Sequence, residues 1–363
     1  MNYRSVCDLN DAIARGFGRL PDDIDLVVGV PRSGLLAANL YALVANVAFV
    51  DLEGFLAGRI LATGRSRPLR QDDDRHDDAS PRRVLVIDDS VNSGAAMREA
   101  RARIAAARID LSRCTFCAVY GTDRHHPDVD IVLERVRRPR LFQWNLFHHK
   151  HLAHSCVDLE GVLQRTRPGG PGDRGRHVAS SPPPAPFHVP STVIGHVVTT
   201  RPERERVAIE AWLASHGIRY RALHMRADGA APVTAPVTAD GLAAYRAGVY
   251  GRTRAVLFVA AHPHEAATIA AASGKPVLCL QTQTVHTGRS PDPVAVARNL
   301  RNLPLRFKLA SGGWRPWRDI VRANVAPRLV ARVKRVTSLP RRTFGRVPAA
   351  AGQASRVVEE HRP

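Results

Sequence analysis

Two neighbouring aspartates, Asp88 and Asp89, follow a run of four apolar residues at 84–87, and small and polar residues come directly after them. Carboxylates accept hydrogen bonds from hydroxyl groups, and consecutive backbone N–H groups at the start of a helix bind phosphate. The combination therefore predicts a sugar-phosphate site in which the carboxylates hold two vicinal hydroxyls. The residues expected to hold the phosphate are Ser90, Val91, Asn92, Ser93, Gly94 and Ala95.

An apolar strand that ends in two acids also occurs in ATPases, whose phosphate loop follows the pattern GxxxxGK[ST]. Gly29 and Gly34 have the glycine spacing of that loop. However, Leu35 and Leu36 stand where a lysine and a hydroxyl residue are required. This disfavours an ATPase, and an incidental acidic turn before a helix is the other alternative.

These residues need a scaffold that brings separate loops to one edge, and residues 25–120 have the pattern of one. Short apolar runs alternate there with helical stretches, which is the βαβ rhythm of an α/β fold with a parallel sheet and helices on both faces. Ligands of such sheets bind at the carboxyl ends of the strands. The apolar runs lie at 25–30, 48–52, 82–88 and 114–121, and the helical stretches at 34–47 and 94–109.

Two segments of this region resemble the type I phosphoribosyltransferases. VLVIDDSVNSGAAM at 84–97 is similar to the family signature, and VVGVPRSGLLAA at 27–38 looks like the family's pyrophosphate loop. The resemblance implies that Asp88 and Asp89 contact the ribose hydroxyls of 5-phosphoribosyl 1-diphosphate (PRPP), and that residues 90–95 hold its 5-phosphate. It also implies Mg²⁺ as the cofactor, bound with the pyrophosphate. The pyrophosphate-binding residues are then Pro31, Arg32, Ser33 and Gly34.

The implied reaction breaks the anomeric C–O bond of PRPP. Fixed hydrogen-bond donors and a metal at the departing pyrophosphate lower the activation barrier for breaking this bond, and no nucleophilic side chain is needed. The polar stretch 53–81 falls where the family has a loop that closes over the site, and its candidate cations are Arg59, Arg65 and Arg67.

The acceptor of the ribosyl group is recognised in this family by a variable hood, for which the candidate segment is 128–147. Phe142 and Trp144 in this segment are either base-stacking residues or, as aromatics in short apolar runs more often are, core residues. The acceptor therefore stays open, as a nitrogen base or a related small molecule.

A second α/β pattern, over 154–280, resembles the haloacid dehalogenase superfamily. The resemblance implies that Asp158 is the nucleophile, that Glu160 stands at the general-acid position, and that Thr199 binds the phosphoryl group. Arg246 stands where a lysine is expected. In the helix expected at 204–218, the apolar residues predicted to share the buried face, with Gly217 as the helix end, are Val207, Ile209, Trp212 and Leu213.

The later motifs of this second domain depart from the family pattern. Ala260, Ala261 and His262 occupy the positions of the metal-binding acids. Asp158 alone supplies too few oxygen ligands for a usual Mg²⁺ site, so we expect the haloacid dehalogenase-like fold without its phosphatase chemistry. Candidate replacement ligands are His262, His264 and Glu265. A phosphatase that uses Asp158 is one alternative function.

Cysteines and histidines offer two further metal hypotheses. Cys114 and Cys117 form a CxxC, but residues three apart in a strand point to opposite faces, so we interpret them as core thiols. The histidine-rich tract at 148–154 invites a zinc site, although its spacing fits no standard one and a polar connector explains it as well.

Length, charge and composition bound the remaining possibilities. The chain has 363 residues and a formal charge of +20, and residues 301–363 hold 15 Lys or Arg against 3 Asp or Glu. We expect a phosphoribosyltransferase domain at 1–150, a haloacid dehalogenase-like domain at 151–290 with a flexible insert at 167–187, and a basic extension at 291–363. Nucleic acid is an alternative partner for the extension.

No stretch approaches the roughly 18 apolar residues of a membrane span. The N-terminus has no secretory pattern, and five cysteines without framework spacing fit a reducing compartment, so we expect a cytoplasmic protein. We separately expect a homo-oligomer. The leading hypothesis is a Mg²⁺-dependent transfer of the 5-phosphoribosyl group from PRPP to a small-molecule acceptor. The alternatives are a PRPP-sensing regulatory or nucleic-acid-binding protein and the phosphatase.

Overall fold

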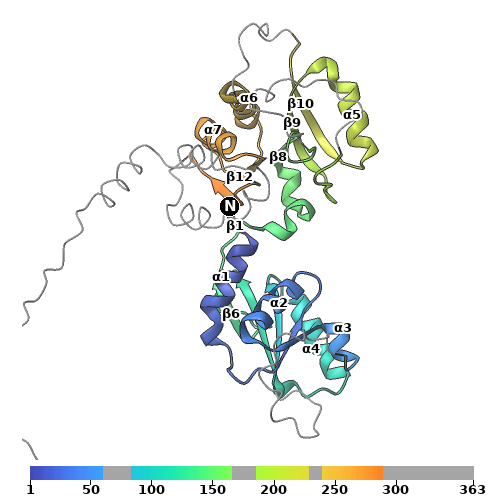
Figure 1. The fold of residues 1–363 in the computed structure, drawn as a ribbon, viewed down its shortest axis with the longest axis vertical. Helices are drawn as coiled ribbons and strands as arrows, with labels where there is room; N and C mark the ends of the chain where they lie inside the picture. The colour runs from blue at the N-terminus through green and yellow to red at the C-terminus, as the bar shows by residue number, and fades with distance from the viewer. Residues whose placement is uncertain (60–82, 166–184, 229–238, 289–363) are drawn as a thin grey trace, which may run out of the picture. The chain divides into compact units, whose positions relative to one another are not determined.

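A computed structural model of the chain describes residues 1–59, 83–165, 185–228 and 239–288. These residues form a five-stranded sheet, a six-stranded sheet and a two-stranded sheet, with helices along the faces of the two larger ones (Figure 1). The expected α/β class with parallel sheets is therefore confirmed. None of the helices in the described ranges is long and apolar enough to cross a membrane.

The first sheet is fully parallel and has the strand order β3-β2-β4-β5-β6. Its strands coincide closely with the apolar runs of the sequence, because a parallel sheet covered on both faces needs continuous apolar strands. The strands are β2 (Leu26–Gly29), β3 (Ala48–Asp51), β4 (Val84–Ser90), β5 (Cys114–Gly121) and β6 (Ile131–Arg135).

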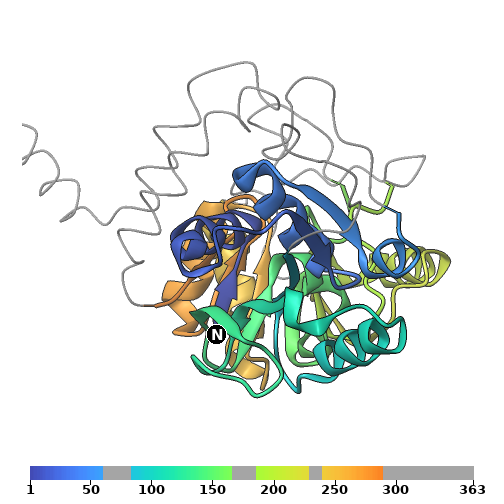
Figure 2. The same ribbon diagram turned by 90° about the horizontal axis from the view of Figure 1, so that it is seen from below.

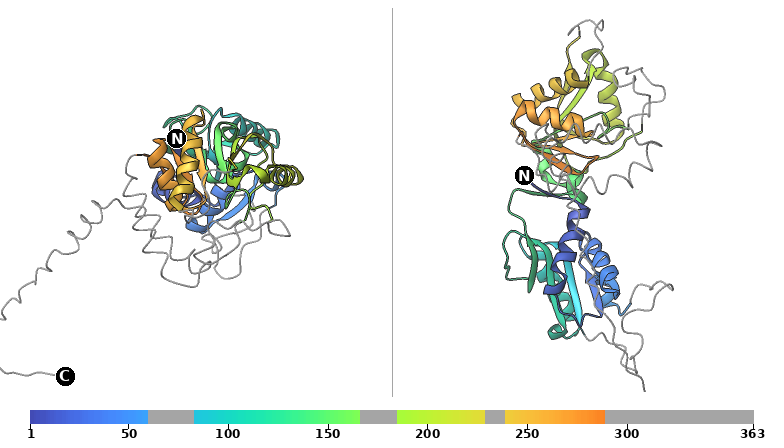
Figure 3. Two further views of the ribbon diagram at one scale, coloured as in Figure 1. Left: turned by 90° about the horizontal axis from the view of Figure 1, so that it is seen from above. Right: turned by 60° about the vertical axis from the view of Figure 1, so that its left-hand side comes forward.

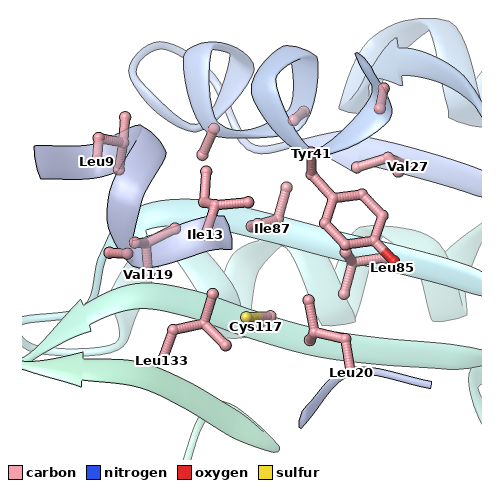
Figure 4. Packing of buried hydrophobic residues seen from close by; sticks show 14 of the residues in the cluster. Leu9, Ile13, Leu20, Val27, Tyr41, Leu85, Ile87, Cys117, Val119 and Leu133 are labelled. Carbon is pink, nitrogen blue, oxygen red and sulfur yellow. The ribbon is translucent and has the colours of Figure 1, made fainter. Parts of the chain in front are cut away.

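Helices cover both faces of this sheet (Figure 2). On one face, α1 (Val6–Gly16) and α2 (Gly34–Ala45) bury Leu85 and Ile87 of β4 (Figure 4). On the other face, α3 (Leu52–Leu56) and α4 (Ala95–Ala106) cover the alternate residues Val84 and Val86. Successive residues of β4 thus point alternately to the two helical layers on either side of the sheet.

Cys114 and Cys117 of β5 are buried and free, and they belong to the cores on opposite faces of the sheet. They are therefore core thiols, as the strand pattern predicts.

A two-stranded parallel sheet joins the N-terminus to the segment after β6. It consists of β1 (Asn2–Arg4) and β7 (Arg140–Phe142). Ser5 then begins α1 with a capping box, in which Asp8 and Ser5 satisfy each other's backbone N–H groups. This pairing fixes β7, which carries Arg140 beside the first sheet's loops.

The second sheet has the order β10-β9-β8-β11-β12-β13, in which β13 alone is antiparallel. Figure 3 shows helices beside this sheet, in yellow and orange. Helix α5 packs on one core of this sheet, and α6 and α7 pack on the other. The strands are β8 (Ser155–Asp158), β9 (Ile194–Pro202), β10 (Tyr220–Arg226), β11 (Leu257–Ala260), β12 (Val277–Cys279) and β13 (Thr284–His286), and the helices are α5 (Arg206–Ser215), α6 (Ala239–Arg252) and α7 (Pro263–Ser273).

Helix α5 corrects one prediction about its buried face. Ile209, Trp212 and Leu213 are buried, whereas Val207 is 80% exposed. A step of two residues is about 200° around a helix, so Val207 lies opposite Ile209. Gly217, with a φ of 66°, follows the end of the helix as expected.

Each large sheet contains a switch point, where the chain continues from two neighbouring parallel strands toward opposite edges of the sheet. In the first sheet this point lies between β2 and β4, and in the second between β8 and β11. Open α/β sheets bind ligands in the crevice beyond the carboxyl ends of such strands. The residues that follow β2, β4, β8 and β11 are therefore the candidates for function.

Candidate functional site

The loops after β2 and β4 meet at the first switch point. Ser33 donates a hydrogen bond from its hydroxyl to Oδ1 of Asp89 over 2.7 Å. A Cβ atom on Gly34 would lie 2.8 Å from the carbonyl oxygen of Ile87 and 3.0 Å from Oδ1 of Asp88, so only glycine allows α2 to begin this close to β4. The two segments singled out in the sequence are thus in direct contact.

The other two residues of the predicted pyrophosphate loop are at the surface. Pro31 and Arg32 are exposed, and the peptide bond between them is cis. Arg32 therefore offers an exposed guanidinium directly ahead of Ser33 and Gly34.

Asp88 and Asp89 have different surroundings. Asp89 is only 3% exposed and accepts hydrogen bonds from Ser33 and, over 2.8 Å, from Nε1 of Trp144. Asp88 is more exposed, and its Oδ1 accepts the backbone N–H of Asp89 over 2.8 Å. Burial and the neighbouring negative charge of Asp89 raise the pKa of Asp88 well above its usual range. Asp89 is fixed by protein donors, and Asp88 is the more accessible carboxylate.

The predicted phosphate loop leaves β4 and enters α4. The Val91 N–H donates to the carbonyl oxygen of Tyr120 over 2.8 Å, which anchors the start of the loop. Gly94 precedes α4 with a φ of 75°, a backbone conformation that disfavours other residues. Asn92, Ser93 and Ala95 are exposed, and Ser90 is the last residue of β4. The amide groups of a helix start therefore lie beside the two carboxylates.

A third segment packs against this loop from the turn between β5 and β6. A Cβ atom on Gly94 would lie 1.8 Å from Oδ2 of Asp128, so the carboxylate of Asp128 occupies the space that a side chain would need. Nη1 of Arg98 donates to the carbonyl oxygen of Ser93 over 2.9 Å and to Oδ2 of Asp128 over 2.5 Å. These contacts hold the loop in place.

Two arginines of the hood segment also reach the phosphate loop, and the sequence reasoning missed both. Nη2 of Arg140 donates to the carbonyl oxygen of Val91 over 2.6 Å, and Nη2 of Arg138 donates to Oδ1 of Asn92. Burial, followed by the nearby charge of Arg138, lowers the pKa of Arg140. The signal available in the sequence was the basic run at 137–140 inside the proposed hood.

The two aromatics of the hood form one stack with Tyr120. Trp144 lies on Phe142 at a centroid distance of 5.1 Å with rings 1° from parallel, and Phe142 lies on Tyr120 at 5.4 Å. Phe142 is a buried core residue, and Trp144 packs partly against the same core. The indole N–H of Trp144 reaches Asp89, so this side chain positions a carboxylate.

Of the candidate loop cations, only Arg59 is described. Its backbone N–H donates to the carbonyl oxygen of Gly54 over 2.8 Å, and its side chain is exposed. Arg65 and Arg67 lie outside the described residues, as does the basic extension at 291–363. Of the predicted insert at 167–187, the described end contacts the domain, because the N–H of Phe187 donates to the carbonyl oxygen of Leu163 over 2.7 Å.

The second switch point brings Asp158, Glu160 and Glu265 around one guanidinium, that of Arg246. The three carboxylates lie 2.9 Å from Nε, 3.2 Å from Nη2 and 2.7 Å from Nη1 of Arg246, respectively. Asp158 is fully buried and Arg246 is 4% exposed. Burial raises the pKa of Asp158 well above its usual range although Arg246 opposes this shift, and the three carboxylates together raise the pKa of Arg246 against its own burial.

The remaining residues predicted for this second site also serve internal contacts. Thr199 donates its hydroxyl hydrogen to Oε1 of Glu160, and Glu160 lies 3.6 Å from Nε of Arg201. Ala260 and Ala261 are buried, whereas His262 and His264 are exposed. Of the proposed replacement ligands, only Glu265 reaches the cluster, and Arg246 pairs with it.

A divalent ion does not fit beside Asp158 in this arrangement, because the guanidinium of Arg246 occupies the position between the carboxylates. The described part of the chain has no group of three or more His, Cys, Asp or Glu side chains arranged to hold a metal ion. That statement includes the histidine tract at 148–154, where His148 contacts Ser191 and His149 lies beside His151.

Comparisons with known proteins add little to this geometry. No family model matches the chain, and no curated protein matches it. Among solved structures, the chain is similar to a purine phosphoribosyltransferase from Pyrococcus horikoshii Ot3, with 16% sequence identity and a TM-score of 0.25. That likeness covers 40% of this chain and 95% of the other chain.

Proposed function

We propose that the first domain binds PRPP and transfers its 5-phosphoribosyl group to a small-molecule acceptor, with release of pyrophosphate. The observation that carries this proposal is the hydrogen bond between Ser33 and Asp89, which joins the two predicted loops at the switch point of a parallel sheet. Binding at such a point is the general behaviour of open α/β sheets. Two motifs that are 56 residues apart in the chain thus converge on one site.

Each part of the site has a chemical counterpart in PRPP. Carboxylates of Asp88 and Asp89 accept hydrogen bonds from the two ribose hydroxyls, since each carboxylate can accept about four. Backbone N–H groups of 90–95, at the start of α4, hold the 5-phosphate. Arg32, Ser33 and Gly34 face the pyrophosphate, whose negative charge grows as the anomeric C–O bond breaks.

Mg²⁺ fits this site through the chemistry of its donors. The pKa of Asp88 is raised by burial and by the charge of Asp89, and a cation that arrives with the pyrophosphate would relieve this repulsion. When bound, the metal would stabilise the charge that develops on the leaving pyrophosphate. Asp88 is the described carboxylate best placed to hold it, because Asp89 is already fixed by Ser33 and Trp144.

Calorimetric titration with PRPP and Mg²⁺ tests the proposal. Replacement of both carboxylates, Asp88→Asn with Asp89→Asn, should weaken PRPP binding at least about 100-fold, because two charge-assisted contacts are lost. Asp110→Asn is the matched control, since Asp110 is exposed and its carboxylate contacts Ser112 and Arg113 of the neighbouring turn. Unchanged PRPP affinity in the double variant, with the fold intact by circular dichroism, would refute the assignment.

A transferase and a PRPP sensor differ in turnover. With an acceptor panel of nitrogen bases, a transferase releases pyrophosphate, whereas a sensor binds PRPP and leaves it intact. The phosphatase alternative has no support in the geometry of the second domain, because the carboxyl group of Asp158 is buried and paired with Arg246.

A further inference from the structure

Two buried arginines in this chain have opposite surroundings. Arg246 is 4% exposed and is paired with three carboxylates. Arg140 is 9% exposed, yet none of the ion pairs in the described ranges involves it. A buried charge without an ion-pair partner is costly for a protein to keep, and the charge of Asp89 offsets only part of the burial of Arg140, whose pKa is lowered. The contrast indicates that Arg140 has a purpose other than stability.

The guanidinium of Arg140 is also incompletely hydrogen-bonded. Nη2 donates to the carbonyl oxygen of Val91, but no described group accepts a hydrogen bond from the buried Nη1. Buried donors are nearly always paired, so an unpaired one at a candidate site calls for an explanation. Its position against Val91 places it beside the start of α4, where the backbone already favours anions.

A second cation flanks the same loop. Arg138 is exposed and donates to the side chain of Asn92, and its charge acts on Arg140. Two like charges two residues apart repel each other, and an anion between them would remove that repulsion. The Phe142 ring lies 5.5 Å from the guanidinium carbon of Arg140 and limits its movement. Arg138 and Arg140 are thus two neighbouring cations of the hood segment whose positions are fixed by contacts with the loop and with Phe142.

We infer that Arg140, assisted by Arg138, binds an anionic oxygen group of the substrates through Nη1, beside the loop at 90–95. This inference rests on the proposed function for the identity of the substrates. Either the 5-phosphate of PRPP or a carboxylate on the acceptor supplies the anion. In the second case the acceptor class narrows to acidic molecules.

Arg140→Met tests the assignment, because methionine is an unbranched side chain of similar length that removes both the charge and the donors. Loss of one charge-assisted contact should weaken binding of the relevant anion about 10- to 100-fold. Arg140→Lys should recover part of that affinity. The matched control is Arg19→Met, since Arg19 donates to the carbonyl oxygens of Leu133 and Val132 away from the loop.

Two calorimetric arms distinguish the source of the anion. The first measures ribose 5-phosphate, and the second compares benzoate with its neutral analogue benzamide in the presence of ribose 5-phosphate. A loss confined to the first arm assigns the phosphate, and loss of a preference for benzoate assigns the acceptor carboxylate. Unchanged affinities in both arms, or no anion binding by the wild-type protein, overturn the inference.

Thermal unfolding separates a binding role from a structural one. Arg140→Met should unfold at the same temperature as the wild type or a higher one, because it removes a buried charge that has no ion pair and a buried donor that has no acceptor among the described residues. A lower midpoint together with unchanged anion affinity would make Arg140 a structural residue. The proposed function is tested independently of this inference, because it depends on PRPP binding by Asp88 and Asp89, which the double variant of these two residues measures.

Discussion

Replacement of Arg246 tests whether its guanidinium holds together the acidic cluster at the second sheet. The change Arg246→Met removes the partner of Asp158, Glu160 and Glu265 while it keeps an unbranched apolar side chain in helix α6. Three charge-assisted contacts of 2.7–3.2 Å are lost. At roughly 1.5–3 kcal/mol each, these contacts sum to about 4–9 kcal/mol. The cost of taking the arginine out of water is absent in the variant, so the net loss is smaller than this sum. We expect a net loss of about 3–5 kcal/mol in the free energy of unfolding.

The assay is a urea titration in which hydrogen exchange reports the stability of each sheet separately. Amides of β8 and β9 should lose protection, and those of β2 and β4 serve as an internal reference. Arg252→Met is the control, because Arg252 lies on the same helix and is exposed. Its effect should stay within about 0.5 kcal/mol.

The deficit of the Arg246 variant should depend on pH with a defined sign. Burial raises the pKa of Asp158, and loss of the arginine removes the main opposing influence. The folded variant therefore holds its protons more tightly than the unfolded chain, and its stability falls as pH rises above the ordinary range of aspartate. A deficit that is larger at pH 5 than at pH 8, or a loss below about 1 kcal/mol, would refute the reasoning.

Two further predictions concern the first site. Because the folded-state pKa of Asp88 is raised, its contribution to wild-type stability should fall as pH rises from about 4 through that pKa. Asp88→Asn should therefore have a shallower pH dependence than the wild type and be the more stable protein at pH 8 by on the order of 1 kcal/mol. Urea midpoints between pH 4 and 8 measure both proteins, and parallel curves would contradict the assigned shift. Gly94→Ala should lower the free energy of unfolding by about 1–3 kcal/mol, because a Cβ atom would collide with Asp128 and the φ of 75° is unfavourable for alanine. Chemical denaturation measures this loss, and a neutral effect would show that the loop at 90–95 is not held as described.

The sequence predicts well those features that depend on local pattern. The strands β2, β4 and β5 follow apolar runs, and α2 and α4 follow periodic ones, because burial on both faces requires such runs wherever the strands pair. The contact between Ser33 and Asp89 follows from the same rhythm, since consecutive βα units place their loops at one edge of the sheet. Val207 was placed wrongly because an apolar type was counted without its angle around the helix.

Contacts between distant segments could not be read from the sequence. Arg140 reaches Val91 across 49 residues, and the pairing of β7 with β1 helps to fix its position. Arg246 meets Asp158 and Glu265 from separate elements, so nothing near it in the chain marks it as the centre of an acidic cluster. Comparison with the family motif shows that arginine stands at a lysine position. It does not show that the planar guanidinium, with its five donors, lies between three carboxylates.

The two switch points of this chain therefore differ in how their charges are balanced. At the second, each charge of the Asp158–Arg246 cluster lies within ion-pair distance of an opposite charge, so a further ion would have to break an existing pair before it could bind. The oxygens of Asp158 and Nε of Arg246 nevertheless have no hydrogen-bond partner among the described residues, so this cluster is balanced in charge rather than in hydrogen bonds. At the first, Asp88 carries a raised pKa and Arg140 carries an unpaired buried donor, so binding of a ligand with both hydroxyl and anionic groups would satisfy groups that the fold leaves unsatisfied. A protein that retains such groups despite their cost in stability is expected to use them, because single substitutions could remove them. On this physical ground, we expect ligand binding at the first sheet, whereas the second sheet holds a charge-balanced cluster.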